Sequence, residues 1–216
     1  MDGIEFQRFH PRESKKMTSL HRRWTSGAPA PAGLNAVDSI GIIATSNHRP
    51  IGYVLASPPH GLARAARRAG WSETGCVWIS RTVWILEDLV VKPGTTGSTN
   101  IGARLVRTLV DDLSAATAMQ GHLYGSTPDR PELIQFWREA GFDVGSPNTP
   151  TLWNHPECTT LHDKAYFPGK RPFAQPLGRE FSLHQAFKRA SPSTDCIPLT
   201  SMNNPQKQPK GTASHD

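Results

Sequence analysis

The feature that most restricts how this 216-residue chain can fold is an apolar run that passes through a proline and a small-residue loop into a helix. Residues 83–91 are apolar apart from one acidic pair, as in a strand buried on both faces. Pro93 ends the run, and residues 94–100 are all Gly, Thr, Ser or Asn. Apolar residues then recur at three- and four-residue steps over 101–119, which predicts a helix.

Such a loop brings backbone N–H groups close to an anion, because no bulky side chain intervenes. The helix that follows adds the positive end of its dipole. The segment is therefore suited to holding a pyrophosphate. A plain strand-to-helix connection is the alternative reading of the same residues.

The neighbouring segments predict a mixed α/β fold. Before the apolar run we expect a short strand at the start, a helix, two strands joined as a hairpin by a polar turn, and a short basic helix, over residues 4–9, 13–24, 37–45, 51–57 and 60–71. After it we expect a strand, a helix that ends at Gly141, and two last strands, over residues 122–126, 131–140, 142–144 and 151–153.

Residues 155–216 lack sustained periodicity, and we expect the last ~25 residues to be disordered. The predicted organisation is one domain over 1–154 and a C-terminal extension over 155–216.

The formal net charge of +6 suits an anionic partner, namely a phosphorylated cofactor, nucleic acid or an acidic surface, or serves solubility alone. Three cysteines, no apolar signal core and no ~20-residue apolar run favour a cytoplasmic protein without a membrane span.

Residues 89–105 resemble the cofactor-binding motif of the GCN5-related N-acetyltransferases (GNAT), written V-x-P-x-x-[RQ]-G-x-G-x-[GA]. Val91, Pro93, Gly97, Gly102 and Ala103 stand at or near its positions, and the run from Phe136 to Phe142 resembles the aromatic helix that ends in Gly-Phe in this family. The resemblance covers about residues 4–154. It implies a central, mostly antiparallel sheet flanked by helices, which splays between the strands ending near Val91 and Ser126 and holds acetyl-CoA as co-substrate in the opening. The cofactor-binding residues that it implies are Leu89, Val90, Val91, Thr96, Gly97, Ser98, Thr99, Asn100, Ile101, Gly102, Ala103 and Trp137.

Two positions depart from the family pattern. Thr96 stands where Arg or Gln is usual, so a hydroxyl replaces a point charge. Trp137 stands where many members have the tyrosine that protonates the CoA thiolate, and an indole N–H is only a hydrogen-bond donor. Tyr124 is the nearest candidate to supply that proton, and core packing is its alternative role.

Glu87 and Asp88 interrupt the apolar strand. Because adjacent strand residues point to opposite faces, we expect at least one of the two carboxylates to face inward. It would pair with an arginine of the 64–68 cluster, or act as a base or an anchor for an amine. The strand resembles the Leu-Glu-Asp-Leu/Phe-x-Val strand of diamine and polyamine N-acetyltransferases, which implies Glu87 as base and Asp88 as amine anchor.

The expected function is thus N-acetyl transfer from acetyl-CoA to a primary amine, with a small cationic acceptor preferred. A non-catalytic module that binds CoA or a basic partner is the alternative, and a homodimer is an open alternative to a monomer. Nucleic acid is not the expected partner, because no stacking aromatic platform accompanies Arg64, Arg67 and Arg68. A role near the CoA 3′-phosphate and a solvated helix face are the alternatives for these arginines. The spacing of His155, Cys158 and His162 is metal-like, but no second ligand pair accompanies it, so no metal is expected.

Overall fold

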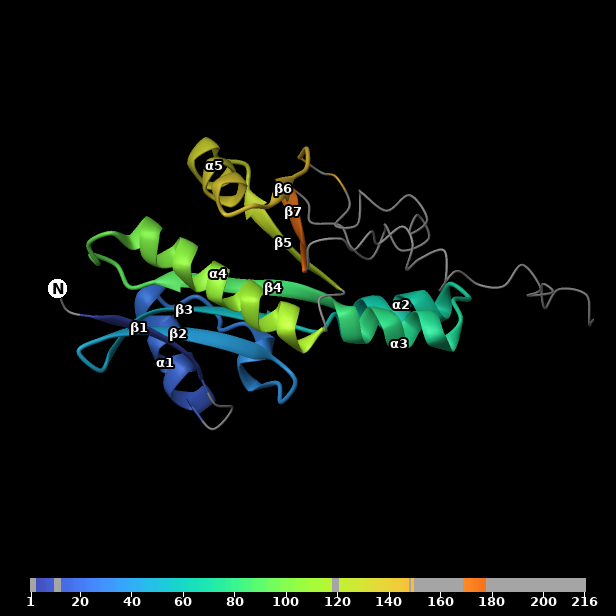
Figure 1. Ribbon diagram of the computed structural model, residues 1–216, viewed down its shortest axis with the longest axis horizontal. Coiled ribbons are helices and arrows are strands. Elements are labelled where there is room, and N and C mark those ends of the chain that lie inside the picture. The colour runs from blue at the N-terminus through green and yellow to red at the C-terminus, as the bar shows by residue number, and fades with distance from the viewer. Residues whose placement is uncertain (1–2, 10–12, 118–120, 148, 150–168, 178–216) are drawn as a thin grey trace, which may run out of the picture.

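A seven-stranded sheet forms the centre of the protein (Figure 1). The computed structural model describes residues 3–9, 13–117, 121–147, 149 and 169–177. The strands are β1 (Ile4–Arg8), β2 (Ile40–Ser46), β3 (Arg49–Ser57), β4 (Val83–Val91), β5 (Gly121–Pro128), β6 (Asp143–Val144) and β7 (Lys170–Leu177). The helices are α1 (Ser14–Trp24), α2 (His60–Arg68), α3 (Glu73–Thr82), α4 (Ser98–Ala116), α5 (Pro131–Glu139) and the short 3-10 helix η2 (Ala32–Asn35).

The strand order is β1-β2-β3-β4-β5-β7-β6. Every neighbouring pair is antiparallel except β4 and β5. The β2–β3 hairpin turns at Asn47 and His48, whose φ values of 49° and 61° are those of a two-residue turn that matches the twist of the strands. The prediction of a mixed α/β fold with a mostly antiparallel, helix-flanked sheet is confirmed.

Helices cover both faces of this sheet. One face packs against α4 and α5, around residues such as Ile42, Val54, Leu105 and Phe173. The other face carries α1 and η2 over β2 to β4, and α2 and α3 over the start of β4 and the adjoining β5 and β7. Figure 1 shows α2 and α3 side by side at one end of the sheet, far from the loop that enters α4.

Two elements differ from the sequence-based expectation. Helix α3 was not predicted, because its apolar residues continue without a break into β4. Ser72 begins it by accepting a hydrogen bond from the Gly75 N–H, at 3.1 Å. Strand β7 lies within the segment expected to be an extension, so the boundary near residue 154 does not coincide with the end of the sheet. The strand expected over 151–153 and the tail expected to be disordered lie outside the described residues.

Candidate active site

β4 and β5 pair over only a short part of their length. Three parallel pairs join them, from Val83 opposite His122 to Ile85 opposite Tyr124. Both strands continue, to Val91 and to Pro128, with no further pairs between them in the described part of the chain. Since alternate residues of a strand direct their N–H groups to opposite sides, part of the β4 backbone beyond Ile85 is left for another partner. The two strands thus separate between the ends where the sequence predicted an opening.

The small-residue loop lies at the far end of β4 and leads directly into α4. Gly97, in the left-handed region with a φ of 71°, precedes the first turn of this helix. No side chain caps the turn, and the turn contains no acidic residue. Thr96, Ser98, Thr99 and Asn100 are exposed around it. The free N–H groups of a first turn fit the pyrophosphate group of a nucleotide such as CoA.

The next residues of the predicted motif serve packing. Ile101 and Gly102 are buried, and Ala103 is half-buried. A Cβ added at Gly102 would lie 3.5 Å from the Phe136 ring, so this glycine faces α5 and not the open side of the loop. Leu89 and Val91 pack on the α4 side of the sheet, and Val90 packs on the α1 side.

A β-bulge at Glu87 places both carboxylates on the same face of the sheet. In the pairing with β3, Leu55 is opposite Asp88 and Ala56 is opposite Leu86, so Glu87 is the extra residue. Leu86 and Leu89 belong to the α4 side, whereas Glu87 and Asp88 contact residues on the side of α1 and η2. The expectation that the two side chains point to opposite faces is wrong for this reason.

Glu87 is held by two neutral donors. Its Oε2 accepts a hydrogen bond from the Gly33 N–H at 2.8 Å, and its Oε1 accepts one from the Ser57 hydroxyl. A Cβ at Gly33 would lie 2.7 Å from Glu87 Oε2, so the close approach depends on glycine at this position. No arginine of the 64–68 cluster pairs with either carboxylate among the described residues, which removes the structural alternative weighed for them.

Asp88, which is half-buried, forms a cluster with the buried side chains of Tyr53 and His21. The Tyr53 hydroxyl donates to Asp88 Oδ2, which also lies 3.0 Å from His21 Nδ1. His21 Nδ1 is 2.6 Å from the Tyr53 oxygen, and because the Tyr53 proton is used on Asp88, Nδ1 is the donor in this contact. Burial, reinforced by the hydrogen bond to Asp88 and by its charge, raises the pKa of Tyr53 far above its usual value, so the hydroxyl remains a donor.

Sequence reasoning missed His21, Tyr53 and Ser57, although each has a signal. Met17, His21 and Trp24 are spaced as one buried stripe of α1, so a titratable side chain occupies a core position. Tyr53 and Ser57 alternate with Leu55 on the same face of β3, where they point toward the acidic pair.

Two predicted residues lie in the core instead of lining an open site. Trp137 is 6% exposed and stacks on Phe173 with ring centroids 4.0 Å apart. It thus packs in the core, and its contact with the cofactor stays a prediction. Tyr124 is fully buried among residues of α2, α3 and β7, as its alternative role in the core requires.

The structure also bears on the basic cluster, the metal-like spacing and the membrane span considered from the sequence. Arg64, Arg67 and Arg68 lie on α2, which follows the end of β3 opposite to the loop before α4. No group of three or more His, Cys, Asp or Glu residues that could hold a metal ion occurs within the described ranges, and His155, Cys158 and His162 lie outside them. Among the described helices, none has the length and apolar character needed to cross a membrane.

Comparisons with known proteins bear on the fold. The sequence matches no protein-family model, and a search of curated proteins gives no significant match. Solved structures do match. An acetyltransferase of the GNAT family from Streptococcus pneumoniae aligns over 82% of this chain and 100% of its own, with 10% sequence identity and a TM-score of 0.54.

Two further structures carry different names on the same fold. An aminoglycoside 6'-N-acetyltransferase complexed with coenzyme A aligns over 82% of this chain and 99% of its own, at 15% identity and a TM-score of 0.50. The AHL synthase LasI aligns over 85% of this chain and 95% of its own, at 12% identity and a TM-score of 0.52. At such identities the likeness concerns the fold and not the substrate. The chain has the fold of the GNAT-family acetyltransferases.

Proposed function

We propose that this chain is an acetyl-CoA-dependent N-acetyltransferase that acts on a primary amine. The observation that carries the proposal is the acidic bulge in β4, which lies two residues beyond the last β4–β5 pair. Glu87 thus sits where the two strands separate. It is oriented by Gly33 and Ser57 and has no cation beside it among the described residues.

The small-residue loop before α4 supports acetyl-CoA as the donor. Its uncapped N–H groups would hold the pyrophosphate, and backbone N–H groups of β4 near Leu89 would polarise the thioester carbonyl. An amine must be neutral to attack that carbonyl carbon. Glu87 would accept its proton, either directly or through one water. The C–S bond then breaks, and the departing thiolate takes up a proton from solvent or from a donor that we do not assign.

The roles of the two carboxylates differ in this proposal. Glu87 is the base, because each of its oxygens keeps a lone pair beyond the hydrogen bond that it accepts. Asp88 Oδ2 is already engaged by Tyr53 and lies beside His21, so Asp88 joins α1 to β4 and holds the bulge in place. Asp88 as the anchor for a cationic amine is the less favoured assignment.

Replacement of Glu87 tests the proposal. In Glu87→Gln the amide oxygen still accepts from Gly33 and the amide nitrogen donates to Ser57, so the fold is preserved while the base is lost. We expect kcat for a responsive amine to fall by at least ~100-fold, with acetyl-CoA affinity unchanged. The loss should shrink at high pH, where more of the amine is already neutral. Glu5→Gln, an exposed change in β1, is the matched control.

A non-catalytic CoA-binding protein is the second candidate. The observation in its favour is that Tyr124 and Trp137 are both buried, so neither reaches the separated strands as a proton donor. Turnover that is unchanged in Glu87→Gln would eliminate this residue as the base. A wild-type protein that binds CoA but acetylates no amine in a broad panel would establish the second candidate.

A further inference from the structure

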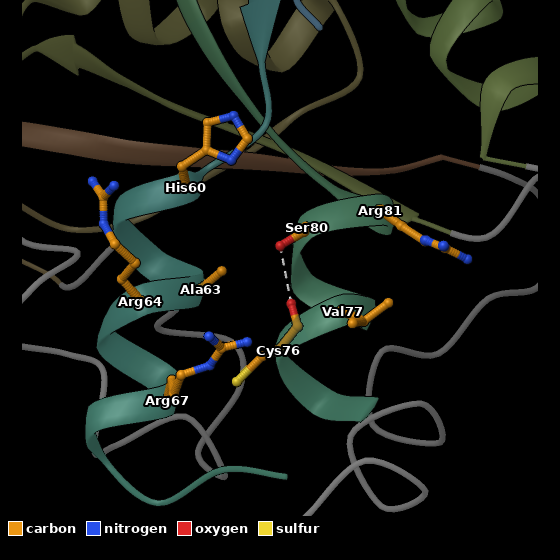
Figure 2. Close-up of a pocket in the computed structure, with 8 residues that line it drawn as sticks. All are labelled: His60, Ala63, Arg64, Arg67, Cys76, Val77, Ser80 and Arg81. Atoms are coloured by element: carbon orange, nitrogen blue, oxygen red, sulfur yellow. Dashed lines mark hydrogen bonds between the residues drawn. The ribbon is translucent and has the colours of Figure 1, made fainter. Parts of the chain in front are cut away.

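A cavity between α2 and α3 is rich in cationic side chains. Its volume is about 440 Å³, and its lining includes His60, Arg64, Arg67 and Arg81 but no acidic residue. Figure 2 shows the Arg67 guanidinium in the space between the two helices, opposite Cys76, with His60 at the upper rim. Arg64 and Arg81 extend from the outer sides of the two helices and flank this space.

Among the described residues, the three arginines have no partner that would make them structural. None of the three forms an ion pair with any residue in the described part of the chain. From residue 57 to residue 82 the sequence has only one acidic residue, Glu73, which lies in the first turn of α3. Favourable interaction with the helix dipole accounts for Arg67 and Arg81, which lie in the last turns of α2 and α3, but not for Arg64.

The cavity is connected to the proposed base through short segments of the chain. Ser57, which donates to Glu87, precedes His60 by three residues, so their Cα atoms are at most about 11 Å apart. Gly33, the other donor to Glu87, precedes Asp38 by five residues, and Asp38 Oδ2 lies 2.7 Å from His60 Nε2. Short segments from Ser57 and from Gly33 thus link Glu87 to His60, which lines the cavity on the same face of the sheet.

We propose that the α2–α3 cavity is an anion subsite of the acceptor, so that the acceptor is an amine that also carries a carboxylate or a phosphate group. This inference rests on the proposed function for the role of Glu87, but not for anion binding itself. Arg67 would form charge-assisted hydrogen bonds with the anionic group, with Arg64 and Arg81 adding charge around it. The amine at the other end of the molecule would then reach Glu87.

Anion binding is tested first, without any reaction. Inorganic phosphate is titrated into the full chain at constant ionic strength, with saturating CoA to fill the loop before α4, and the arginine Nε–Hε resonances are followed by NMR. We expect saturable binding whose Kd rises at least tenfold in Arg67→Gln. Arg68→Gln is the matched control, because it removes the same charge from the same helix outside the cavity lining. Its Kd should stay within about twofold of the wild type.

Pairs of acceptors that differ in one anionic group test whether the cavity binds the acceptor. Lysine and cadaverine share an amine but differ by a carboxylate, and glucosamine 6-phosphate and glucosamine differ by a phosphate. In one pair we expect the acceptor that carries the anionic group to have a KM at least tenfold below that of the acceptor without it, and this ratio to collapse in Arg67→Gln while kcat is kept. The pair that responds identifies the anionic group.

The failures are distinguishable. No saturable phosphate binding, or equal weakening by Arg67→Gln and Arg68→Gln, overturns the anion subsite. Phosphate binding without any preference for anionic acceptors overturns the assignment of the cavity to the acceptor. A wild type that binds phosphate through Arg67 but transfers acetyl to no amine overturns the proposed function and leaves the anion site standing.

Discussion

At the scale of single residues, Tyr53 connects the groups that join α1 to β4. Its ring is buried against Trp24, and its hydroxyl lies between His21 and Asp88. The phenol donates a hydrogen bond to the Asp88 carboxylate and accepts one from the His21 imidazole, so a half-buried and a buried titratable side chain both depend on one neutral group.

Removal of this hydroxyl should destabilise the fold. Tyr53→Phe leaves Asp88 without its tyrosine donor and His21 without the tyrosine oxygen. We expect the free energy of unfolding to fall by about 1–3 kcal/mol, as measured by urea denaturation. Tyr166→Phe, which changes a tyrosine of residues 150–168, serves as the comparison. A loss no greater than in that variant would show that the cluster does not stabilise the protein.

The raised pKa of Tyr53 also gives a pH dependence with a definite sign. In the unfolded chain tyrosine ionises near pH 10, whereas Tyr53 stays protonated in the folded state. Above about pH 10 the folded state therefore binds more protons, and stability decreases as the pH rises. Below the unfolded pKa the contribution is constant. The difference in stability between wild type and Tyr53→Phe should become smaller between about pH 9 and 11.

At the scale of elements, the strand, loop and helix around Pro93 follow from the sequence, because proline, small residues and a three-to-four apolar repeat are local signals. The position of Glu87 does not. It depends on how β4 pairs with β3, and a bulge leaves no mark in the residues of β4 themselves. Helix α3 could not be predicted for another reason. Val77 and Ile79 continue the apolar run of β4, and only Ser72 marks the start of the helix.

The first turn of α4 carries the prediction for cofactor binding. Asn100→Asp adds one negative charge without changing the shape of the side chain. The negative charge interacts favourably with the positive end of the helix dipole, so the melting temperature should stay constant or rise slightly. It opposes a pyrophosphate at the same turn, so acetyl-CoA affinity should fall about tenfold, or 1.4 kcal/mol, in calorimetry. Gln7→Glu in β1 is the charge control. Unchanged acetyl-CoA affinity in Asn100→Asp would show that the pyrophosphate does not bind at this turn.

At the scale of the whole molecule, β7 completes the sheet from a distant part of the sequence. It pairs with β5 on one side and with β6 on the other, and Phe173 packs against Trp137. A strand that takes its place only through partners far along the chain shows no helical or hairpin signal nearby. The fold class could therefore be predicted from residues 4–154, whereas the last strand of the sheet could not.

Two truncations separate the part of the C-terminal segment that the sheet needs from the part that it does not. A chain that ends at residue 191 keeps β7, and the sequence beyond it lacks apolar periodicity. We expect its melting temperature to stay within a few degrees of the full chain in circular dichroism. A chain that ends at residue 168 lacks β7, leaves β6 without a partner and β5 paired only with β4, and exposes Trp137, so it should fail to fold cooperatively. A stable shorter chain would contradict this assignment.

The bulge in β4 also bears on how activity is gained and lost during evolution. Without Glu87, Leu86 and Asp88 would be adjacent and would keep their partners Ala56 and Leu55, so the strand would become regular along its whole length. The loss of a single codon would thus delete the proposed base and leave every other register of the sheet intact. If Glu87 is the base as proposed, one in-frame deletion would convert a catalytic protein on this scaffold into an inactive one, and the reverse insertion would restore the acidic pair in a single step.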